Sequence, residues 1–258
     1  PARRIPRTRL LTRAECLRRL PGLSAEGVTG AVVWHDGQIY NSERLTLAFV
    51  RAASARGAGV VNYLRVTDLL VMDGRVAGVR AEDRLTGARR DVRGRVVVNA
   101  SGPWVNHVLG LLNGQAIPQI PHVKTINVII DRPLADGHAF SVTSASPAGP
   151  GARGTARRLF VTPWRGRTIL GSSHGWTGET PEGCAVTSQE IEGLIGDFNR
   201  AYPGARVQSE EVCGTYVGLL PHESGDRADD PAHLARRYRI VDHGRAGGPV
   251  GLLSVIGV

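Results

Sequence analysis

Hydrophobic positions in the first half of this chain alternate between the spacing of a helix and that of β-strands. Leu45, Leu47 and Val50 supply one apolar side of a predicted helix over Glu43–Arg56. Strand spacing then appears in four runs, Val60–Tyr63, Val66–Met72, Val76–Asp83 and Arg89–Val98. Asp73-Gly74 and Thr86-Gly87 separate the last three runs, where hairpin turns belong. These patterns predict a helix, a buried strand, a three-stranded antiparallel excursion and a return to a buried strand.

Strand patterns dominate the second half of the chain, which contains one clearly marked helix. Thr187 and Glu190 form a capping box, and Ile191, Leu194 and Phe198 follow on one helical face. The strand patterns are His122–Ile130, His138–Thr143, Arg158–Thr162, Thr168–Ser173, Arg206–Leu219, Tyr238–Asp242 and Val250–Ile256. We therefore expect an antiparallel sheet with one helix. Residues before Gly30 are polar and irregular, apart from a helical stretch over Arg13–Leu20.

The segment Val96–Trp104, which reads VVVNASGPW, carries the most informative local signal. Three valines predict a buried strand, small residues follow, and Pro103 opens a helix that runs to Leu112. In open α/β sheets, ligands bind at the carboxyl ends of strands, where small residues allow close approach to the backbone. The turn Ala100-Ser101-Gly102 is therefore a candidate cofactor contact; the structural alternative is an ordinary strand-to-helix turn.

Composition adds limits to this picture. The 258 residues are 41% hydrophobic and 21% charged, as in ordinary globular proteins. The net charge is +9, and Lys124 is the only lysine among many dispersed arginines. A basic surface can attract anionic lipid headgroups or an anionic substrate. Aromatic residues make up 5% and no nucleic-acid-binding motif is present, so we expect no nucleic-acid partner. No metal-ligand spacing occurs, and the three scattered cysteines fit a reducing compartment.

Five blocks in register resemble one flavoprotein family. They are WHDGQIYNSERL with GAGVVNYLRV (Trp34–Val66), RVVVNASGPWV (Arg95–Val105), FVTPWRGRTILGSSH (Phe160–His174), EVCGTYVGLLP (Glu211–Pro221) and GLLSVIGV (Gly251–Val258). The order and spacing of these blocks are similar to those of the FAD-dependent glycerol-3-phosphate dehydrogenases, within the D-amino-acid-oxidase-type superfamily. The resemblance implies an α/β (mixed α+β) fold: a partial Rossmann-like FAD-binding domain with an antiparallel substrate domain.

The resemblance also implies an activity. Members oxidise sn-glycerol 3-phosphate to dihydroxyacetone phosphate, with hydride passing from C2 to flavin N5 and electrons then passing to quinone at a membrane surface. The implied cofactor is FAD and the implied partners are this small substrate and quinone. The expected location is the cytoplasm, with a peripheral position on the inner face of the plasma membrane left open.

Several positions match cofactor-contacting positions of the family. Val66 matches a residue whose backbone faces the adenine end of FAD, and Gly257 matches the first glycine of a late Gly-Gly-Lys segment. Ala100, Ser101 and Gly102 match the turn near the pyrophosphate and ribose, and Trp104 opens the helix after it. The structural alternative for Val66 is a plain core valine.

The substrate-binding blocks depart from the family. Leu220 stands where better-known members have an arginine that is thought to hold the substrate phosphate, and an aliphatic side chain cannot donate to phosphate. His174 replaces a common aspartate and is a candidate base, or else a strand-end histidine bonded to a loop. The candidate phosphate contacts are Lys124, Arg165 and Arg167; a solvated strand-end lysine and a solvated hairpin are the alternatives.

The predicted domains are residues 1–112, a partial FAD-binding domain with the excursion at about 60–95; residues 113–245, the substrate domain; and residues 246–258, a return strand. The strand-turn-helix with Gly-x-Gly-x-x-Gly at its turn, which holds the pyrophosphate in this superfamily, is not found in the chain. We therefore expect a central piece of a longer enzyme that is inactive in isolation. Two alternatives remain: a related FAD enzyme acting on an amine or a 2-hydroxy acid, and a non-catalytic basic module that binds nucleic acid or membrane.

Overall fold

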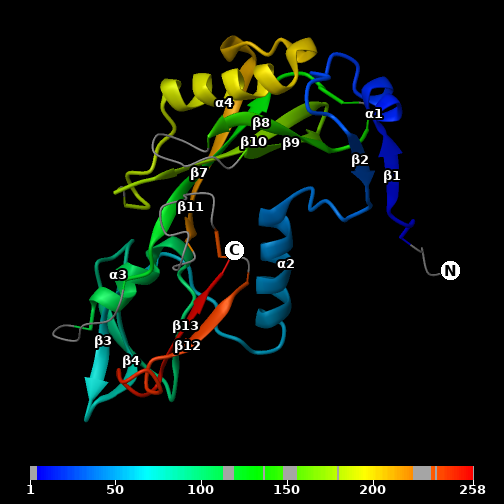
Figure 1. The fold of residues 1–258 in the computed structure, drawn as a ribbon. Coiled ribbons are helices and arrows are strands. Elements are labelled where there is room, and N and C mark those ends of the chain that lie inside the picture. Colours follow the sequence, from blue (N-terminus) through cyan, green and yellow to red (C-terminus); the bar gives the residue numbers. More distant parts are fainter. Residues whose placement is uncertain are drawn as a thin grey trace. The chain divides into compact units, whose positions relative to one another are not determined.

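The structure is a computed structural model, and it describes residues 5–112, 119–135, 137–147, 156–178, 180–222, 234–235 and 237–257. Contacts divide the chain into two compact units (Figure 1). The first comprises Pro1–Ala53, Ile126–Ser173 and Ala185–Val217, and the second comprises Ser54–Thr125, His174–Cys184 and Gly218–Val258. The domain boundaries expected from the sequence stay a prediction.

The first unit begins with a small strand pair, and only its first strand lies in residues that the sequence predicted to be irregular. Strand β1 (Arg9–Thr12) pairs antiparallel with β2 (Gly30–Val33), and helix α1 (Arg13–Arg19) lies between them in the chain. The expected helix α1 begins with a capping box between Thr12 and Glu15. Helix α2 (Ser42–Ser54) also forms where expected, but none of its residues is buried, and Phe49 is 69% exposed.

A five-stranded sheet and helix α4 (Ser188–Ala201) contain the core of the first unit. The strand order is β11-β7-β10-β9-β8, with β7 at His122–Ile130, β8 at Phe140–Pro147, β9 at Ala156–Trp164, β10 at Arg167–Trp176 and β11 at Val212–Pro221. The pairs β8–β9 and β9–β10 are antiparallel, as predicted. Helix α4 begins with the predicted capping box and lies along one face of the sheet (Figure 1). Phe198 of α4 is fully buried against Leu159 and Leu170 of the sheet.

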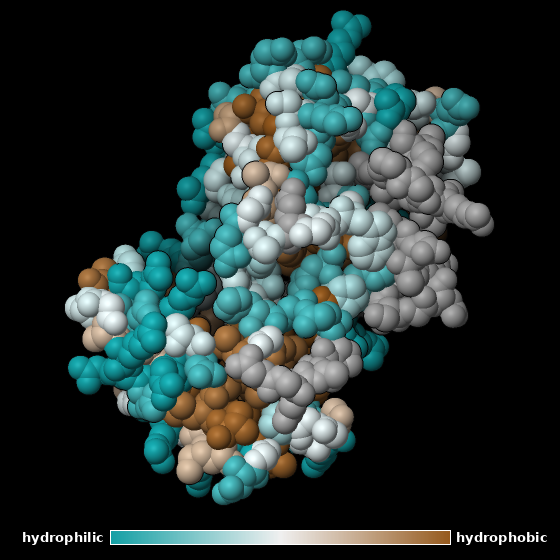
Figure 2. Space-filling model, turned by 90° about the vertical axis from the view of Figure 1, so that its left-hand side faces the viewer, coloured by the Kyte–Doolittle hydropathy of each residue, from teal (hydrophilic) through white to brown (hydrophobic). Residues whose placement is uncertain are grey.

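The second unit contains two three-stranded sheets and one short helix. Strands β3 (Leu64–Met72), β4 (Arg75–Asp83) and β5 (Arg89–Arg93) form the predicted antiparallel excursion. The other sheet has the order β12-β13-β6, with β12 at Arg239–Asp242, β13 at Leu252–Ile256 and β6 at Val97–Asn99. Leu69, Val76 and Leu252 pack with helix α3 (Val105–Gly110) in its core. Figure 2 shows further hydrophobic side chains on the surface of this unit.

Four local predictions were wrong in their boundaries. Residues 60–63 form no strand, and Tyr63 has a left-handed φ of 55°, which ends any extended run before β3. The single strand expected over Arg89–Val98 is two strands, β5 and β6, in different sheets. Strand β11 begins only at Val212, after a short 3-10 turn at Ser209–Glu211. The helix expected over Pro103–Leu112 is a 3-10 turn, Gly102–Trp104, followed by α3. The mixed α/β fold class is nevertheless confirmed.

Within the part of the chain that the structure describes, no helix is both long enough and apolar enough to cross a membrane.

Candidate cofactor and substrate site

The turn that follows β6 is open and consists of small residues. Ala100 and Gly102 are exposed, and Ser101 is half-buried. Gly102 has a φ of 57°, a conformation that favours glycine, and no atom lies within 4 Å of the place where its Cβ would be. A ligand can therefore approach the backbone of this turn closely.

Asn99 holds the turn in place from inside the second unit. This residue is 3% exposed, and its Oδ1 accepts hydrogen bonds from the Ser101 hydroxyl at 2.6 Å and the Ser101 N–H at 3.4 Å. Its Nδ2 donates to the carbonyl of Val105 at 3.2 Å, which ties the end of β6 to the start of α3. Asn99 was not among the residues predicted from the sequence; a polar residue directly after three valines was the available signal.

A second strand reaches the same edge of the sheet. Strand β13 is parallel to β6, with Leu252 opposite Val97 and Ser254 opposite Asn99. Because the carboxyl ends of parallel strands lie at the same edge, Gly257 follows β13 where the turn follows β6. A Cβ on Gly257 would lie 2.8 Å from Cβ of Tyr238, so packing requires glycine here. The structure thus brings Gly257 and the turn to one edge of this sheet, and their contacts with the cofactor stay a prediction.

Val66 lies elsewhere in the second unit, within the excursion sheet. It is half-buried in β3 and pairs with Ala81 of β4, next to an irregularity in the register between Val66 and Asp68. Its cofactor role stays a prediction.

Trp104 lies at the border of the turn and forms one long-range hydrogen bond. Its indole Nε1 donates to Oε1 of Glu182 at 2.5 Å. This bond lowers the pKa of the Glu182 carboxyl, with smaller lowering effects from its own backbone N–H, the Thr180 hydroxyl and the charge of His107. Both residues line a hollow of about 420 Å³, and its other lining residues include Asn106, Ile120, His122, Thr177 and Leu219.

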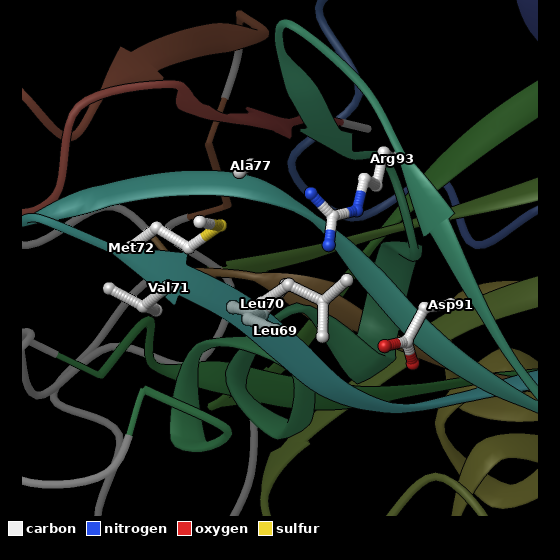
Figure 3. A pocket seen from close by; sticks show the side chains of 7 residues that line it. All are labelled: Leu69, Leu70, Val71, Met72, Ala77, Asp91 and Arg93. Carbon is white, nitrogen blue, oxygen red and sulfur yellow. The ribbon is translucent and has the colours of Figure 1, made fainter.

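Another hollow, of 270 Å³, lies on the excursion sheet (Figure 3). Leu70 and Met72 come from β3, and Asp91 and Arg93 come from β5. Arg80 donates two hydrogen bonds to the Asp91 carboxylate, from Nε at 2.8 Å and from Nη2 at 3.1 Å. None of the predicted site residues lines this hollow, and we assign it no function.

His174, the candidate base, is bonded to Thr125. The Oγ1 of Thr125 and the Nδ1 of His174 lie 2.9 Å apart, and His174 is half-buried. Lys124 precedes Thr125 and is only 6% exposed, unlike a solvated strand-end lysine. Close by in the chain, the Trp176 ring lies 4.5 Å from the ring of the buried His222. Lys124 and Thr125 of β7 and His174 of β10 all belong to the second unit, and β7 and β10 are neighbouring strands.

The two candidate arginines belong to the first unit and already have partners. The Arg165 guanidinium lies 4.7 Å from the Trp164 ring centroid and 5.5 Å from that of Tyr40, as in cation–π contacts. Arg167 donates to Asp131 at 2.6 Å, which raises the pKa of the guanidinium. Arg165 is exposed, so its stacking still leaves part of the cation in solvent. Leu220, at the position of the family arginine, is half-buried.

No group of three or more His, Cys, Asp or Glu residues suited to a metal ion occurs among the described residues.

A pair of parallel strands that ends in an open turn of small residues is typical of α/β proteins that bind a dinucleotide cofactor. A comparison with family models identifies the family. The model described as FAD dependent oxidoreductase (DAO) matches residues 2–252, and the chain belongs to this family.

Two curated relatives and one solved structure show the closer similarities. The chain is 29% identical to an alpha-glycerophosphate oxidase of Streptococcus pyogenes over 86% of its own length and 36% of the relative's. It is 27% identical to a glycerol-3-phosphate dehydrogenase of Synechocystis over 98% of its length and 46% of the relative's. The glycerol-3-phosphate dehydrogenase of Bacillus halodurans, solved with FAD, superposes with a TM-score of 0.75 at 24% identity, covering 96% of this chain and 45% of that one. This chain thus spans less than half the length of each.

The residues of the second unit fit one part of an FAD site. The open turn at Ala100–Gly102 can approach a phosphate or ribose, and no Cβ blocks Gly102. No strand followed by Gly-x-Gly-x-x-Gly and a helix, the unit that binds the pyrophosphate, occurs among the described residues. The prediction of FAD as the cofactor is confirmed for the family.

Proposed function

We propose that this chain is part of an FAD-dependent enzyme that oxidises sn-glycerol 3-phosphate to dihydroxyacetone phosphate. One structural observation supports FAD as the cofactor. The open turn after β6 is fixed by the buried Asn99 and lies at the sheet edge that Gly257 also reaches. The substrate half is supported by the names of the relatives, alpha-glycerophosphate oxidase and glycerol-3-phosphate dehydrogenase.

In this proposal the turn and the residues of β7 and β10 have separate tasks. Ala100–Gly102 and Gly257 hold the cofactor by backbone contact, and bound FAD supplies the acceptor for the two electrons of the substrate C2–H bond. His174 takes the proton of the C2 hydroxyl. The Nδ1 of His174 lies 2.9 Å from the Thr125 hydroxyl, and this hydrogen bond orients the imidazole ring for that task. Lys124 supplies positive charge for the phosphate, and its burial strengthens that attraction.

Leu220 favours a second candidate, oxidation of an amine or a 2-hydroxy acid by the same cofactor. A leucine at the family's arginine position removes a donor to phosphate, which a substrate without phosphate does not need. Arg165 stays a candidate phosphate contact, because it is exposed in the Pro-Trp hairpin of the first unit.

The electron acceptor and the location are proposed on the same basis. We infer quinone as the acceptor, at the inner face of the cytoplasmic membrane, and the net charge of +9 supports attraction to anionic lipid. The relative named as an oxidase makes oxygen the competing acceptor.

Turnover of the full-length protein on a substrate panel tests the proposal. Glycerol 3-phosphate, glycine, proline and lactate are each supplied with FAD and either a quinone analogue or oxygen alone. Reduction of the quinone analogue by glycerol 3-phosphate only is the expected result. Oxidation of an amine or lactate without glycerol 3-phosphate activity would establish the second candidate instead. Thermal shift with FAD serves as the binding control, because it does not require turnover.

A further inference from the structure

The hydrogen bond between Trp104 and Glu182 joins two segments that are far apart in the chain. Trp104 ends the 3-10 turn Gly102–Trp104, directly after the open turn. Glu182 lies in the segment His174–Cys184, which begins at the candidate base. Both residues belong to the second unit, and the bond between them measures 2.5 Å.

From this contact we infer that Glu182 is a positioning residue for the cofactor turn: it holds the Trp104 indole and thereby fixes the backbone of Ser101-Gly102-Pro103. The inference rests on the proposed function, because it assumes that FAD binds at this turn.

The geometry explains why an external anchor is needed. The 3-10 turn has no side-chain cap at Ser101, and Gly102 adopts a conformation that glycine leaves with little cost. Asn99 fixes the turn on its strand side, and the Trp104 indole is the next long side chain along the chain. Trp104 is 40% exposed, so packing alone does not immobilise its ring. An ionised carboxylate gives the indole N–H a charge-assisted bond, which is stronger than one to a neutral acceptor.

The opposite side of the hollow is also fixed. Asn106, two residues after Trp104, accepts from the Ile120 N–H at 2.9 Å and donates to the Ile120 carbonyl at 2.8 Å. The start of α3 is therefore hydrogen-bonded to Ile120 through Asn106 and to Glu182 through Trp104. Loss of the second anchor leaves Asn106 in place, so the unit is expected to stay folded while the turn becomes looser.

The test is the FAD affinity of the full-length protein, measured by titrating the apoprotein with FAD and following flavin fluorescence. Glu182→Ala is expected to weaken FAD binding about three- to tenfold, the size expected for loss of one partly exposed charge-assisted hydrogen bond. Trp104→Phe replaces the indole by a smaller aromatic ring without an N–H and is expected to show a similar loss of FAD affinity. The double variant is expected to lose no more than either single variant, because both changes remove one shared bond. Glu182→Gln keeps an acceptor oxygen and is expected to stay within about threefold of wild type.

Matched controls separate positioning from general damage. Glu192→Ala removes an exposed carboxylate from α4, and Trp34→Phe alters a tryptophan that is 52% exposed in the first unit. Both are expected to bind FAD like wild type. Thermal unfolding of each apoprotein reports stability separately from affinity.

Three results overturn the inference. One is an FAD affinity of Glu182→Ala equal to that of wild type. Another is a double variant in which the losses of FAD affinity of Glu182→Ala and Trp104→Phe multiply. The third is a lower thermal midpoint with no change in FAD affinity. A wild-type protein that takes up no FAD overturns the proposed function, and this inference with it.

Discussion

At the scale of single residues, Asn99 is the side chain on which the cofactor turn depends most directly. Replacing it with alanine removes the acceptor for Ser101 and the donor to the Val105 carbonyl. We expect Asn99→Ala to lower the free energy of unfolding by about 1–3 kcal/mol, because buried polar groups lose their partners. Urea unfolding followed by circular dichroism measures the change. Ser101→Ala, which removes one hydroxyl, should cost less; equal stability of Asn99→Ala and wild type would contradict the role described here.

The residues of the site were predictable only where they follow one another in the chain. Ala100, Ser101 and Gly102 stand out because small residues end a strand. Glu182 could not be found in this way, because its partner Trp104 lies 78 positions earlier and only the fold brings them together. The bond between Thr125 and His174 likewise depends on the neighbouring positions of β7 and β10 in the sheet.

At the scale of elements, strand β10 contains a glycine that tolerates no side chain. A Cβ on Gly171 would lie 2.0 Å from Oδ1 and 3.1 Å from Cβ of Asn127, so the Asn127 side chain cannot simply rotate away. We expect Gly171→Ala to cost about 1–3 kcal/mol in unfolding free energy through overpacking. Gly175→Ala in the same strand is the matched control, because no atom lies within 4 Å of its Cβ position.

Chemical denaturation of both glycine variants measures this difference. Asn127→Ala should restore part of the stability of Gly171→Ala, since it removes the atoms that clash. A Gly171→Ala variant no less stable than Gly175→Ala would show that the strand can shift to admit the methyl group.

Elements defined by local interactions agreed with their predictions, and those defined by distant pairing did not. The capping box at Thr187 and the β3–β4 hairpin depend on residues a few positions apart, and both form as predicted. The run Arg89–Val98 divides because β5 pairs with β4, whereas β6 pairs with β13 from much later in the chain. Periodicity cannot reveal that choice of partner, since both halves of the run have the same β-type pattern.

At the scale of the whole molecule, two histidines of the second unit determine the response to mild acid. Burial lowers the pKa of His243, which is 5% exposed and bonded to Ser254 at 2.9 Å, and also that of His122. The ordinary pKa of histidine is 6.5. Below this pH, the two imidazoles bind protons more readily in the unfolded chain than in the folded chain. The free energy of unfolding should therefore fall as the pH decreases through 6.5 and should be insensitive to these groups above it.

Urea unfolding at a series of pH values between about 7.5 and 5 measures the slope of the unfolding free energy against pH. Each histidine contributes at most about 1.4 kcal/mol per pH unit to this slope. His243→Gln keeps a polar side chain and should reduce the slope. The carboxyls of Asp83, Asp91 and Glu211 have lowered pKa values and lose their stabilising contribution only at more acidic pH. A flat stability curve over the histidine range would contradict the assignment.

The alternation of the chain between its two units has a consequence for biosynthesis and for proteolysis. The chain passes from one unit to the other after Ala53, Thr125, Ser173, Cys184 and Val217. Neither unit is a continuous stretch, so the first cannot be completed on the ribosome until Val217 has emerged, and the second must wait still longer. A protease that cuts the chain where it passes from one unit to the other would leave fragments that still pack together in the core of one unit. We expect such a nicked protein to elute from a sizing column like the intact one and to separate only after denaturation.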